Sequence, residues 1–511
     1  MRESPRPDLE NRGSPSRWDG PFKLENCGNL APLKEVLEKA GFTEQALSQT
    51  LKVHGSQPGR DLPLFLRRTH EPTPYNTLVH LFVLAQEVPR GAARAALEPL
   101  DLDELASTGL IEACDGGIRS TASILPCTDL LIARDFWPEF MENPCPENYV
   151  LGVGPSSMAV VNLTVRKTGE DVLDLGCGCG VQALFAARHA RKVIATDTNP
   201  RALNFTEFNA RLNTYPNIET RLGSLYEPVS DLRFDLIVSN PPFVISPKRA
   251  YEYRDSGMQG DAVSEQVIRG APGLLRDGGY CTVLLNWHHT HQDDWAQRPR
   301  QWVESGMCDA WILCSDVVLP VEYAAQWLRR DSEASRGAYA ALLDEWVAYY
   351  RDLGIGRIST GAIILRRVSG RSGWIRAERA PDGLPSGSSS EQIQRIFTVQ
   401  DMLEGLNDDR ELLDMKFVLI PEHQLEHLLQ AEDGKWVVQK AAIRQTEGFQ
   451  FIGNVDKLVA TVLAGCTGQH CLGELVNDLA KGLSMDSEKI IPGCIQIIRK
   501  LLETGYLFPV Q

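Results

Sequence analysis

The four residues Asn240-Pro241-Pro242-Phe243 carry the groups needed to hold a planar NH2 group in place. They follow the apolar run Phe234–Ser239, which predicts a buried strand. The Asn240 amide oxygen and the backbone carbonyl that follows it can accept the two N–H bonds of an amide or an exocyclic amine. The aromatic ring can stack on the planar group. A nitrogen bound in this way would direct its lone pair at a methyl donor.

A glycine-rich segment, Gly176–Gly180 (GCGCG), lies upstream between a predicted strand and a predicted helix. Glycine allows positive φ and a close approach of the backbone to a ligand. The spacing differs from the GxGxxG pattern of dinucleotide-binding proteins, which disfavours a nicotinamide cofactor. The next predicted strand ends in Asp197, whose carboxylate can accept both hydroxyl protons of a ribose. A helix cap is the alternative role, because Asn199 and Pro200 open the next predicted helix.

Two clusters contain residue types that bind metals. Cys177 and Cys179 form a CxC pair, but no second pair lies in register with it. The run His288–His291, with Asp293 and Asp294, follows a predicted strand and precedes a predicted helix, which indicates a solvated loop. The sequence therefore predicts no metal site.

The composition limits the classes of partner. The 511-residue chain carries 52 Lys and Arg against 67 Asp and Glu, a formal net charge of −15. This acidity argues against a general phosphate-binding surface but allows a local basic groove. The twelve cysteines show no even framework, and the sequence has no long apolar run. Residues 1–20 are charged and Pro-rich rather than apolar, so we expect no secretory signal. We therefore expect free thiols, a cytoplasmic protein and no membrane segment.

From about residue 149 the pattern alternates between strands and helices, which is typical of a doubly wound parallel sheet. A helix predicted at Tyr339–Leu353 lies between the last two strands, so the sheet should end in an antiparallel pair. We expect an α/β fold with a seven-stranded, Rossmann-like sheet. The predicted strands are Asp171–Leu175, Lys192–Thr196, Ile218–Leu222, Phe234–Ser239, Gly279–Leu285, Ala310–Cys314 and Gly361–Arg366.

The flanks differ in composition from this central region. Residues 1–26 are polar and Pro-rich, which predicts a mobile tail. Residues 27–148 show helical patterns followed by strand-like segments, which predict a helical, winged-helix-like domain. We expect the sheet domain over 149–379 and a flexible, Ser- and Gly-rich linker over 380–391. A mostly helical accessory domain should occupy 392–511 and end in a small winged-helix-like module.

The GxGxG segment resembles motif I of class I S-adenosylmethionine (SAM) methyltransferases, and Asn240–Phe243 resembles motif IV of amino-methyltransferases. The resemblance implies a SAM-dependent N-methyltransferase. It also implies that Asn240 and the Pro241 carbonyl bind the acceptor nitrogen while Phe243 stacks on it. The residues implied in SAM binding are Gly176, Gly178 and Gly180 in the loop, Asp174 at the methionine ammonium, Asp197 at the ribose, Ser224 and Leu225 at the adenine, and Asn240.

The surroundings of both motifs resemble the release-factor glutamine methyltransferases, in the branch typical of eukaryotes and archaea. The resemblance covers about Gly152 to Leu285 and includes the segments 196–202, 240–247, 257–261 and 274–279. Two positions depart from that branch. Phe243 stands where glutamine and adenine enzymes usually have tyrosine. Phenylalanine at this position is common among guanine N2 enzymes. The segment Gly152–Ser157 replaces an acidic Glu-Pro-x-Glu-Asp pattern.

A protein glutamine side chain is the favoured acceptor, and two alternatives stay open. One is an RNA or DNA amino-methyltransferase acting on guanine N2 or adenine N6, whose winged-helix-like domain would grip the polymer. The other is a non-catalytic SAM-binding scaffold, which the intact glycines, Asp197 and Asn240 disfavour. Candidate phosphate contacts for the nucleic-acid alternative are Arg67, Arg68, Lys248, Arg249, Arg329, Arg330, Arg366 and Arg367.

Overall fold

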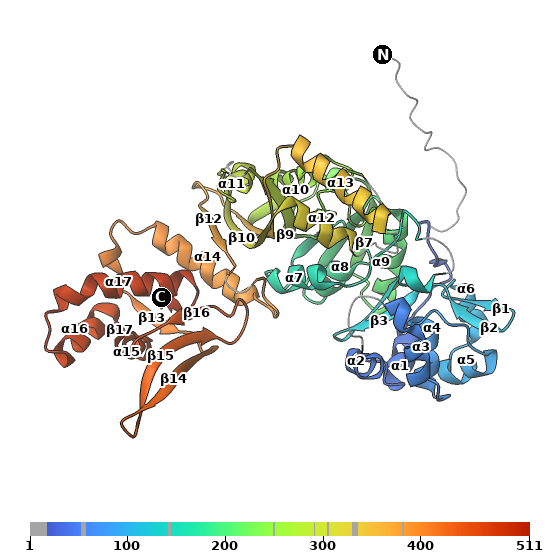
Figure 1. The fold of residues 1–511 in the computed structure, drawn as a ribbon, viewed down its shortest axis with the longest axis horizontal. Helices are drawn as coiled ribbons and strands as arrows, with labels where there is room; N and C mark the ends of the chain where they lie inside the picture. Colours follow the sequence, from blue (N-terminus) through green and yellow to red (C-terminus); the bar gives the residue numbers. More distant parts are fainter. Residues whose placement is uncertain are drawn as a thin grey trace, which may run out of the picture.

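The computed structural model describes residues 18–52, 58–141, 145–248, 251–290, 292–303, 306–329, 336–380 and 383–510. Three parts follow one another along the molecule (Figure 1). A central domain (residues 145–380) holds a large sheet, with an N-terminal module (residues 18–141) at one end and a C-terminal module (residues 383–510) at the other. Among the helices in these ranges, none is both long and apolar enough to span a membrane.

The central domain is built on an eight-stranded sheet with the strand order β12-β10-β11-β9-β8-β5-β6-β7. Strands β5 to β9 run parallel, whereas β11 runs antiparallel to both β9 and β10. The predicted α/β class and the antiparallel end of the sheet are confirmed. The strands are β5 (Asp171–Leu175), β6 (Lys192–Asp197), β7 (Ile218–Leu222), β8 (Phe234–Ser239), β9 (Leu275–His289), β10 (Cys308–Val318), β11 (Arg357–Arg367) and β12 (Ile375–Arg379).

Two features of the sheet correct the sequence prediction. The prediction of seven strands missed the edge strand β12, because three of its five residues are charged and no apolar run marks it. Strand β9 also extends further than predicted. His288 and His289, which we expected in a solvated loop, are therefore strand residues paired with β11.

Helices cover both faces of the sheet, and alternate strand residues face them. Val172 belongs to the same buried cluster as residues of α7 and α8, whereas Leu173 belongs to a cluster with residues of α10. Because β5, β6 and β8 are parallel, the segments that follow them meet at one edge of the sheet. The helices are α7 (Pro155–Leu163), α8 (Val181–Ala187), α9 (Pro200–Leu212), α10 (Ala262–Leu274), α11 (Gln297–Val303), α12 (Pro320–Leu328) and α13 (Arg336–Asp352).

In its described residues the N-terminal module has six α-helices followed by two hairpins, and α9 anchors it. Ala133 N donates to Asn209 Oδ1 (2.7 Å), and Asn209 Nδ2 donates back to Ala133 O (2.8 Å). Asn213 makes the same pair of bonds with Leu131. The two amides thus bond to β4 as a neighbouring strand would. The elements are α1 (Ala31–Lys39), α2 (Glu44–Leu51), α3 (Pro58–Arg68), α4 (Pro74–Phe82), α5 (Arg90–Leu97), α6 (Leu102–Ser107), β1 (Ile111–Cys114), β2 (Gly117–Ser120), β3 (Ser123–Cys127) and β4 (Leu130–Arg134).

Residues 18–26, which we assigned to a mobile tail, are packed against the protein. Phe22 and Leu24 are buried, and the Phe22 ring stacks on Phe208 with centroids 3.7 Å apart. The Asn204 side chain accepts from Phe22 N (3.1 Å) and donates to Phe22 O (2.8 Å). A few apolar residues within a polar segment are therefore enough to fix it. Residues 1–17 lie outside the described residues.

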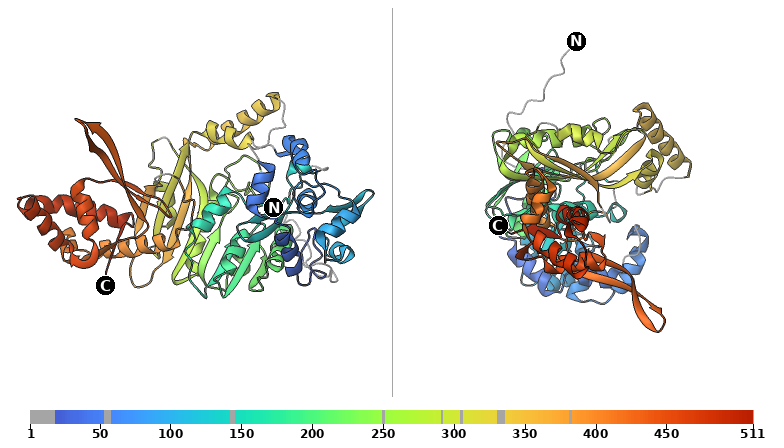
Figure 2. Two further views of the ribbon diagram at one scale, coloured as in Figure 1. Left: turned by 90° about the horizontal axis from the view of Figure 1, so that it is seen from below. Right: turned by 90° about the vertical axis from the view of Figure 1, so that its left-hand side faces the viewer.

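The described residues of the C-terminal module contain the helices α14 to α17 together with two three-stranded sheets. The longest missed elements are β14 (His423–Glu432) and β15 (Lys435–Gln445), a hairpin that projects from the module in Figure 2. Most of its residues are exposed, so no buried face produces an alternating pattern. The other elements are α14 (Ser390–Glu404), β13 (Lys416–Leu419), β16 (Ile452–Asn454), α15 (Lys457–Gly465), β17 (Thr467–Cys471), α16 (Leu472–Gly482), α17 (Ser487–Glu503) and β18 (Leu507–Pro509).

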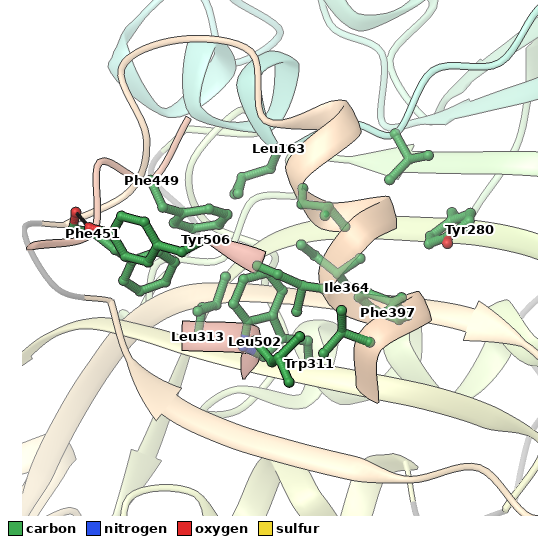
Figure 3. Close-up of a cluster of buried hydrophobic side chains, with 14 of the residues drawn as sticks. Leu163, Tyr280, Trp311, Leu313, Ile364, Phe397, Phe449, Phe451, Leu502 and Tyr506 are labelled. Atoms are coloured by element: carbon green, nitrogen blue, oxygen red, sulfur yellow. Dashed lines mark hydrogen bonds between the residues drawn. The ribbon is translucent and has the colours of Figure 1, made fainter. Parts of the chain in front are cut away.

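The core of the C-terminal module continues onto one face of the central sheet (Figure 3). The Phe397 ring of α14 lies 5.5 Å from that of Tyr280 and 4.8 Å from that of Trp374, measured between centroids. Trp311 meets Phe449 at 5.0 Å. Apolar packing of this kind joins the module to the sheet along α14.

The end of the predicted flexible linker is also bonded to the central domain. Ser389 N donates to Asn162 O (2.8 Å), and Ser390 Oγ accepts from Arg166 N (2.8 Å). Both serines are buried. The linker prediction therefore fails at its end, where the serines fix the start of α14. Residues 381 and 382 lie outside the described residues.

Candidate active site

A cavity of about 520 Å³ opens where β5, β6 and β8 end. Its volume is in the range of pockets that enclose cofactor-sized molecules. The segments that follow these strands supply most of the lining that we predicted. The predicted site residues in the lining are Gly176, Gly178, Asp197, Ser224, Leu225, Asn240, Pro241, Pro242 and Phe243.

The glycine-rich loop presents its backbone to the cavity. Gly176 and Gly178 have φ of 76° and 55°, and a Cβ on either would meet nothing within 4 Å. Gly180 also has positive φ, but it is not among the lining residues, and its Cβ would lie 2.9 Å from Thr206. Gly176 and Gly178 therefore border the cavity, whereas Gly180 permits close packing against α9.

Asp197 is bonded to this loop. Its Oδ2 accepts from Gly178 N (2.9 Å), and its Oδ1 accepts from Asn199 N (2.9 Å). Each carboxylate oxygen can accept a second bond, so the side chain can still receive two ribose hydroxyls. Burial raises the pKa of Asp197, and the nearby charge of Glu252 acts in the same direction.

Asp174 lies behind the loop and is not among the residues that line the cavity. Its Oδ2 accepts from Ala183 N (2.9 Å) in α8, while Oδ1 is buried with no partner among the described residues. Burial raises the pKa of Asp174 to about 7. The side chain thus connects β5 to α8 through Oδ2, and its direct contact with a cofactor ammonium stays a prediction.

In the Asn240 side chain, the amide nitrogen is hydrogen-bonded and the amide oxygen is not. Its Nδ2 donates to Ser156 Oγ (3.3 Å), and its Oδ1 is buried with no partner among the described residues. The strand that carries it is fixed by Ser239, whose Oγ donates to Leu175 O (2.7 Å). A buried acceptor without a partner costs roughly 1–3 kcal/mol, which a ligand N–H would offset.

The segment after Asn240 is clamped by residues 251–255. Phe243 forms an isolated antiparallel bridge with Asp255, and Val244 N donates to Arg254 O (3.1 Å). The fully buried Asp255 carboxylate accepts from Ser246 Oγ (2.8 Å) and Tyr251 N (3.1 Å). These bonds fix the Phe243 backbone at the cavity wall.

The sequence analysis missed several lining residues. They come from β4, from the segment between β4 and α7, from the first turn of α7, from residues 252–258 and from α12. The departure of Gly152–Ser157 from the acidic pattern was a usable signal for Ser156. The others carry no recognisable motif, because tertiary packing alone brings them to the cavity. They include Arg134, Trp137, Tyr149, Ser156, Glu252, Tyr253 and Trp327.

Two of the candidate phosphate contacts form ion pairs within the fold. Arg366 is largely buried and pairs with Asp309 (Nε to Oδ2, 3.0 Å), so it belongs to the core of the fold rather than to a binding surface. Lys248 pairs with Glu345 at 2.6 Å. Arg249 and Arg330 lie outside the described residues.

The histidine cluster of β9 is bonded within the fold. His288 Nε2 lies 3.5 Å from Asp261 Oδ1, and His289 Nε2 lies 3.2 Å from Ser359 Oγ. Within the described ranges, no group of three or more His, Cys, Asp or Glu side chains is placed to hold a metal ion.

Residues 154–297 match the methyltransferase small domain family. Two domains of unknown function match the flanks, DUF7059 over residues 40–121 and DUF7782 over residues 394–509. The chain is 31% identical to the release factor glutamine methyltransferase of Geobacter sulfurreducens over 205 residues, which cover 37% of this chain and 68% of that protein.

For two further relatives, the matched region covers a smaller share of the relative's length. The ribosomal protein uL3 glutamine methyltransferase of Bradyrhizobium diazoefficiens is 29% identical over 29% of this chain and 52% of its own. The ribosomal RNA small subunit methyltransferase C of Escherichia coli is 30% identical over 30% of this chain and 44% of its own. The names of these relatives cover both protein and RNA acceptors.

Proposed function

The chain belongs to the family of SAM-dependent methyltransferases that includes the release factor glutamine methyltransferases, and we propose that it methylates the side-chain amide of a protein glutamine. The observation that carries this proposal is the buried, unpartnered Oδ1 of Asn240 at the cavity that Gly176 and Gly178 border. An acceptor in this position fits an N–H donor of a planar NH2 group.

The chain's residues hold and orient the two reactants. SAM supplies an electrophilic methyl group on its sulfonium. In the proposed site Gly176, Gly178, Asp197, Ser224 and Leu225 bind the cofactor. Backbone groups and Leu225 would contact the adenine, because Ser224 stands where an acidic side chain is common.

Asn240 Oδ1 and the Pro241 carbonyl accept the two N–H bonds of the acceptor, and Phe243 stacks on the amide plane. These acceptors stabilise the positive charge that develops on the NH2 group as its nitrogen becomes tetrahedral. No strong general base is therefore needed before methyl transfer. The methylated nitrogen would carry a positive charge and would then lose one of its own two N–H protons to solvent. Most of the acceleration then comes from aligning nitrogen and methyl group in a fixed geometry, and Ser156 contributes by orienting the Asn240 amide.

A nucleobase amino group is the second candidate acceptor. Phe243 in place of tyrosine and the similarity to a ribosomal RNA methyltransferase favour it. The net charge of −15 and the burial of Arg366 favour protein. If nucleic acid is the acceptor, binding will weaken steeply with salt, whereas a protein acceptor predicts a flat dependence.

The remaining assignments are part of the same proposal. The helices and hairpins at 27–148 form a winged-helix-like domain, and a similar small module ends the accessory domain at 392–511. The twelve free cysteines support a reducing, cytoplasmic location.

Labelling tests the acceptor class directly. Cell lysate is incubated with the protein and tritiated SAM. One portion of the labelled product is then digested with nuclease and another with protease. We expect protease to release the label and amino-acid analysis to recover it as N5-methylglutamine. If nuclease alone releases the label, the acceptor is a nucleobase and not glutamine. If neither fraction contains label that depends on the protein, the proposed enzymatic activity is contradicted.

A further inference from the structure

A buried arginine from the N-terminal module reaches the cavity of the central domain. Arg134 is the last residue of β4, is 2% exposed and is among the residues that line the cavity. The Asn209 side chain fixes its position, because Nδ2 donates both to Ala133 O (2.8 Å) and to Cys179 O (2.9 Å). Cys179 belongs to the glycine-rich loop, so β4 and this loop are held side by side.

Among the described residues, no carboxylate forms an ion pair with the Arg134 guanidinium, although the charges of Asp135 and Glu139 act on it from further away. Its Nε and Nη2 are buried and have no hydrogen-bond partner among the described residues. The neighbouring Asp135 carboxylate is already engaged, since it accepts from Arg201 Nε (3.0 Å) and Val150 N (2.8 Å). The guanidinium carbon lies 4.0 Å from the Trp137 ring centroid, which covers one face of the cation. Burial lowers the pKa of Arg134, as expected for a desolvated cation.

A hydroxyl group accompanies this cation. Tyr149 is 2% exposed and lines the same cavity, and its OH has no partner among the described residues. Gly152 makes room for the arginine, because a Cβ there would lie 2.1 Å from Arg134 Cδ. The other arginine of the lining, Arg254, is by contrast paired with Asp255 (Nε to Oδ1, 3.1 Å). The corner around Arg134 and Tyr149 therefore presents hydrogen-bond donors and positive charge, which suit an anion.

We infer that Arg134 and Tyr149 bind the carboxylate at the methionine end of SAM, so that the N-terminal module completes the cofactor site. This assignment rests on the proposed function of the cavity. SAM carries a single carboxylate, and a planar guanidinium matches two carboxylate oxygens at once. Asp197 bonds to the loop at Gly178, whereas β4 meets it at Cys179. The acidic Asp197 would repel the carboxylate, which leaves the Arg134 corner to receive it.

Isothermal titration with two ligands tests this inference without any turnover. Decarboxylated SAM keeps the adenosine, the sulfonium and the amine but lacks the carboxylate. We expect the wild-type protein to bind SAM at least roughly tenfold more tightly than decarboxylated SAM, in line with hydrogen bonds to a charged group. In Arg134→Met that preference should disappear, because SAM affinity falls while affinity for decarboxylated SAM stays within about twofold.

Two further variants separate binding from folding. Arg188→Met is the matched control, because Arg188 pairs with Asp129 at the surface and is not among the lining residues. It should keep the wild-type preference. Tyr149→Phe removes only the hydroxyl and should reduce the preference by a smaller factor than Arg134→Met. Thermal unfolding of each variant confirms that the titrated protein is folded.

The outcomes distinguish the inference from the function beneath it. Equal affinity of the wild type for the two ligands, or an equal loss of both in Arg134→Met, would overturn the carboxylate assignment while SAM binding itself stands. Failure of the wild type to bind either ligand would contradict the proposed function as well.

Discussion

The two modules that flank the central sheet are attached in different ways, and only one of them reaches the cavity. The N-terminal module is bonded to α9 through the directional amides of Asn209 and Asn213, and it brings Arg134 and Trp137 to the lining. The C-terminal module shares a continuous hydrophobic core with the sheet, yet none of the described lining residues follows Trp327. A shared core therefore does not imply a shared site.

The position of each attachment explains the difference. The amides of α9 act beside the glycine-rich loop, close to the ends of the parallel strands. One attachment of the C-terminal module is made by Arg371, which bonds both to Asp309 (2.7 Å) of β10 and to Asp401 (2.7 Å) of α14. Strand β10 lies at the antiparallel end of the sheet, several strands away from β5. The C-terminal module can therefore affect stability without contacting the cofactor.

The largest expected effect concerns the cavity itself. Asn240→Ala removes the acceptor for the substrate nitrogen and should lower turnover by roughly 100- to 1,000-fold or more. The SAM affinity, measured by titration, should stay within about twofold, since both modules and the loop stay in place. Asn76→Ala, in the first turn of α4 and outside the cavity lining, is the control and should leave both values unchanged. Loss of SAM binding in Asn240→Ala would show that the acceptor assignment is wrong.

Asn209→Ala should combine a loss of stability with a loss of cofactor affinity. It leaves Ala133 and the Cys179 carbonyl without their side-chain partner, which should lower the free energy of unfolding by about 2–4 kcal/mol. Because β4 and the loop are no longer tied, SAM affinity should fall by roughly tenfold. Urea unfolding and titration measure the two values. If the variant is destabilised but its SAM affinity is unchanged, the attachment of the N-terminal module does not contribute to cofactor binding.

Asp401→Ala is the corresponding change at the C-terminal attachment. It removes a partner of Arg366, Arg371 and Trp374, so the free energy of unfolding should fall by about 1–3 kcal/mol. SAM affinity should stay within about twofold at a temperature where the protein is folded. A tenfold loss of SAM affinity would mean that the attachment of the C-terminal module also affects cofactor binding.

The smallest effect is expected in the projecting hairpin. Trp436 of β15 is 73% exposed, so Trp436→Ser should change the free energy of unfolding by less than about 0.5 kcal/mol. SAM affinity should not change. A clear loss of stability would mean that the hairpin packs against the rest of the molecule.

The sequence predicts the parts of the fold and site that depend on local pattern. The apolar runs of β5, β6 and β8 mark buried parallel strands, and the chain direction places the glycines, Asp197 and Asn240 at one edge of the sheet. Charged β12 and the exposed hairpin escaped prediction because neither has a buried, apolar run.

Arg134, Tyr149 and Ser156 could not be found in the same way. Their position depends on how β4 and the start of α7 pack against the sheet, and on the amide of Asn209 in particular. Asp174 illustrates a different case: its place beside the glycine motif predicts a ligand contact, whereas the bond from α8 to its Oδ2 depends on tertiary packing.

Titration of SAM into the wild-type protein and into Asp197→Ala tests the cofactor cavity most directly. Asp197 lines the cavity and holds the glycine-rich loop through Gly178, while Asp231→Ala at an exposed position serves as the control. We predict that one SAM binds each wild-type chain, that Asp231→Ala binds equally well, and that Asp197→Ala loses roughly tenfold or more in affinity. Absence of binding by the wild type at millimolar SAM, or equal affinity in Asp197→Ala, would contradict the account.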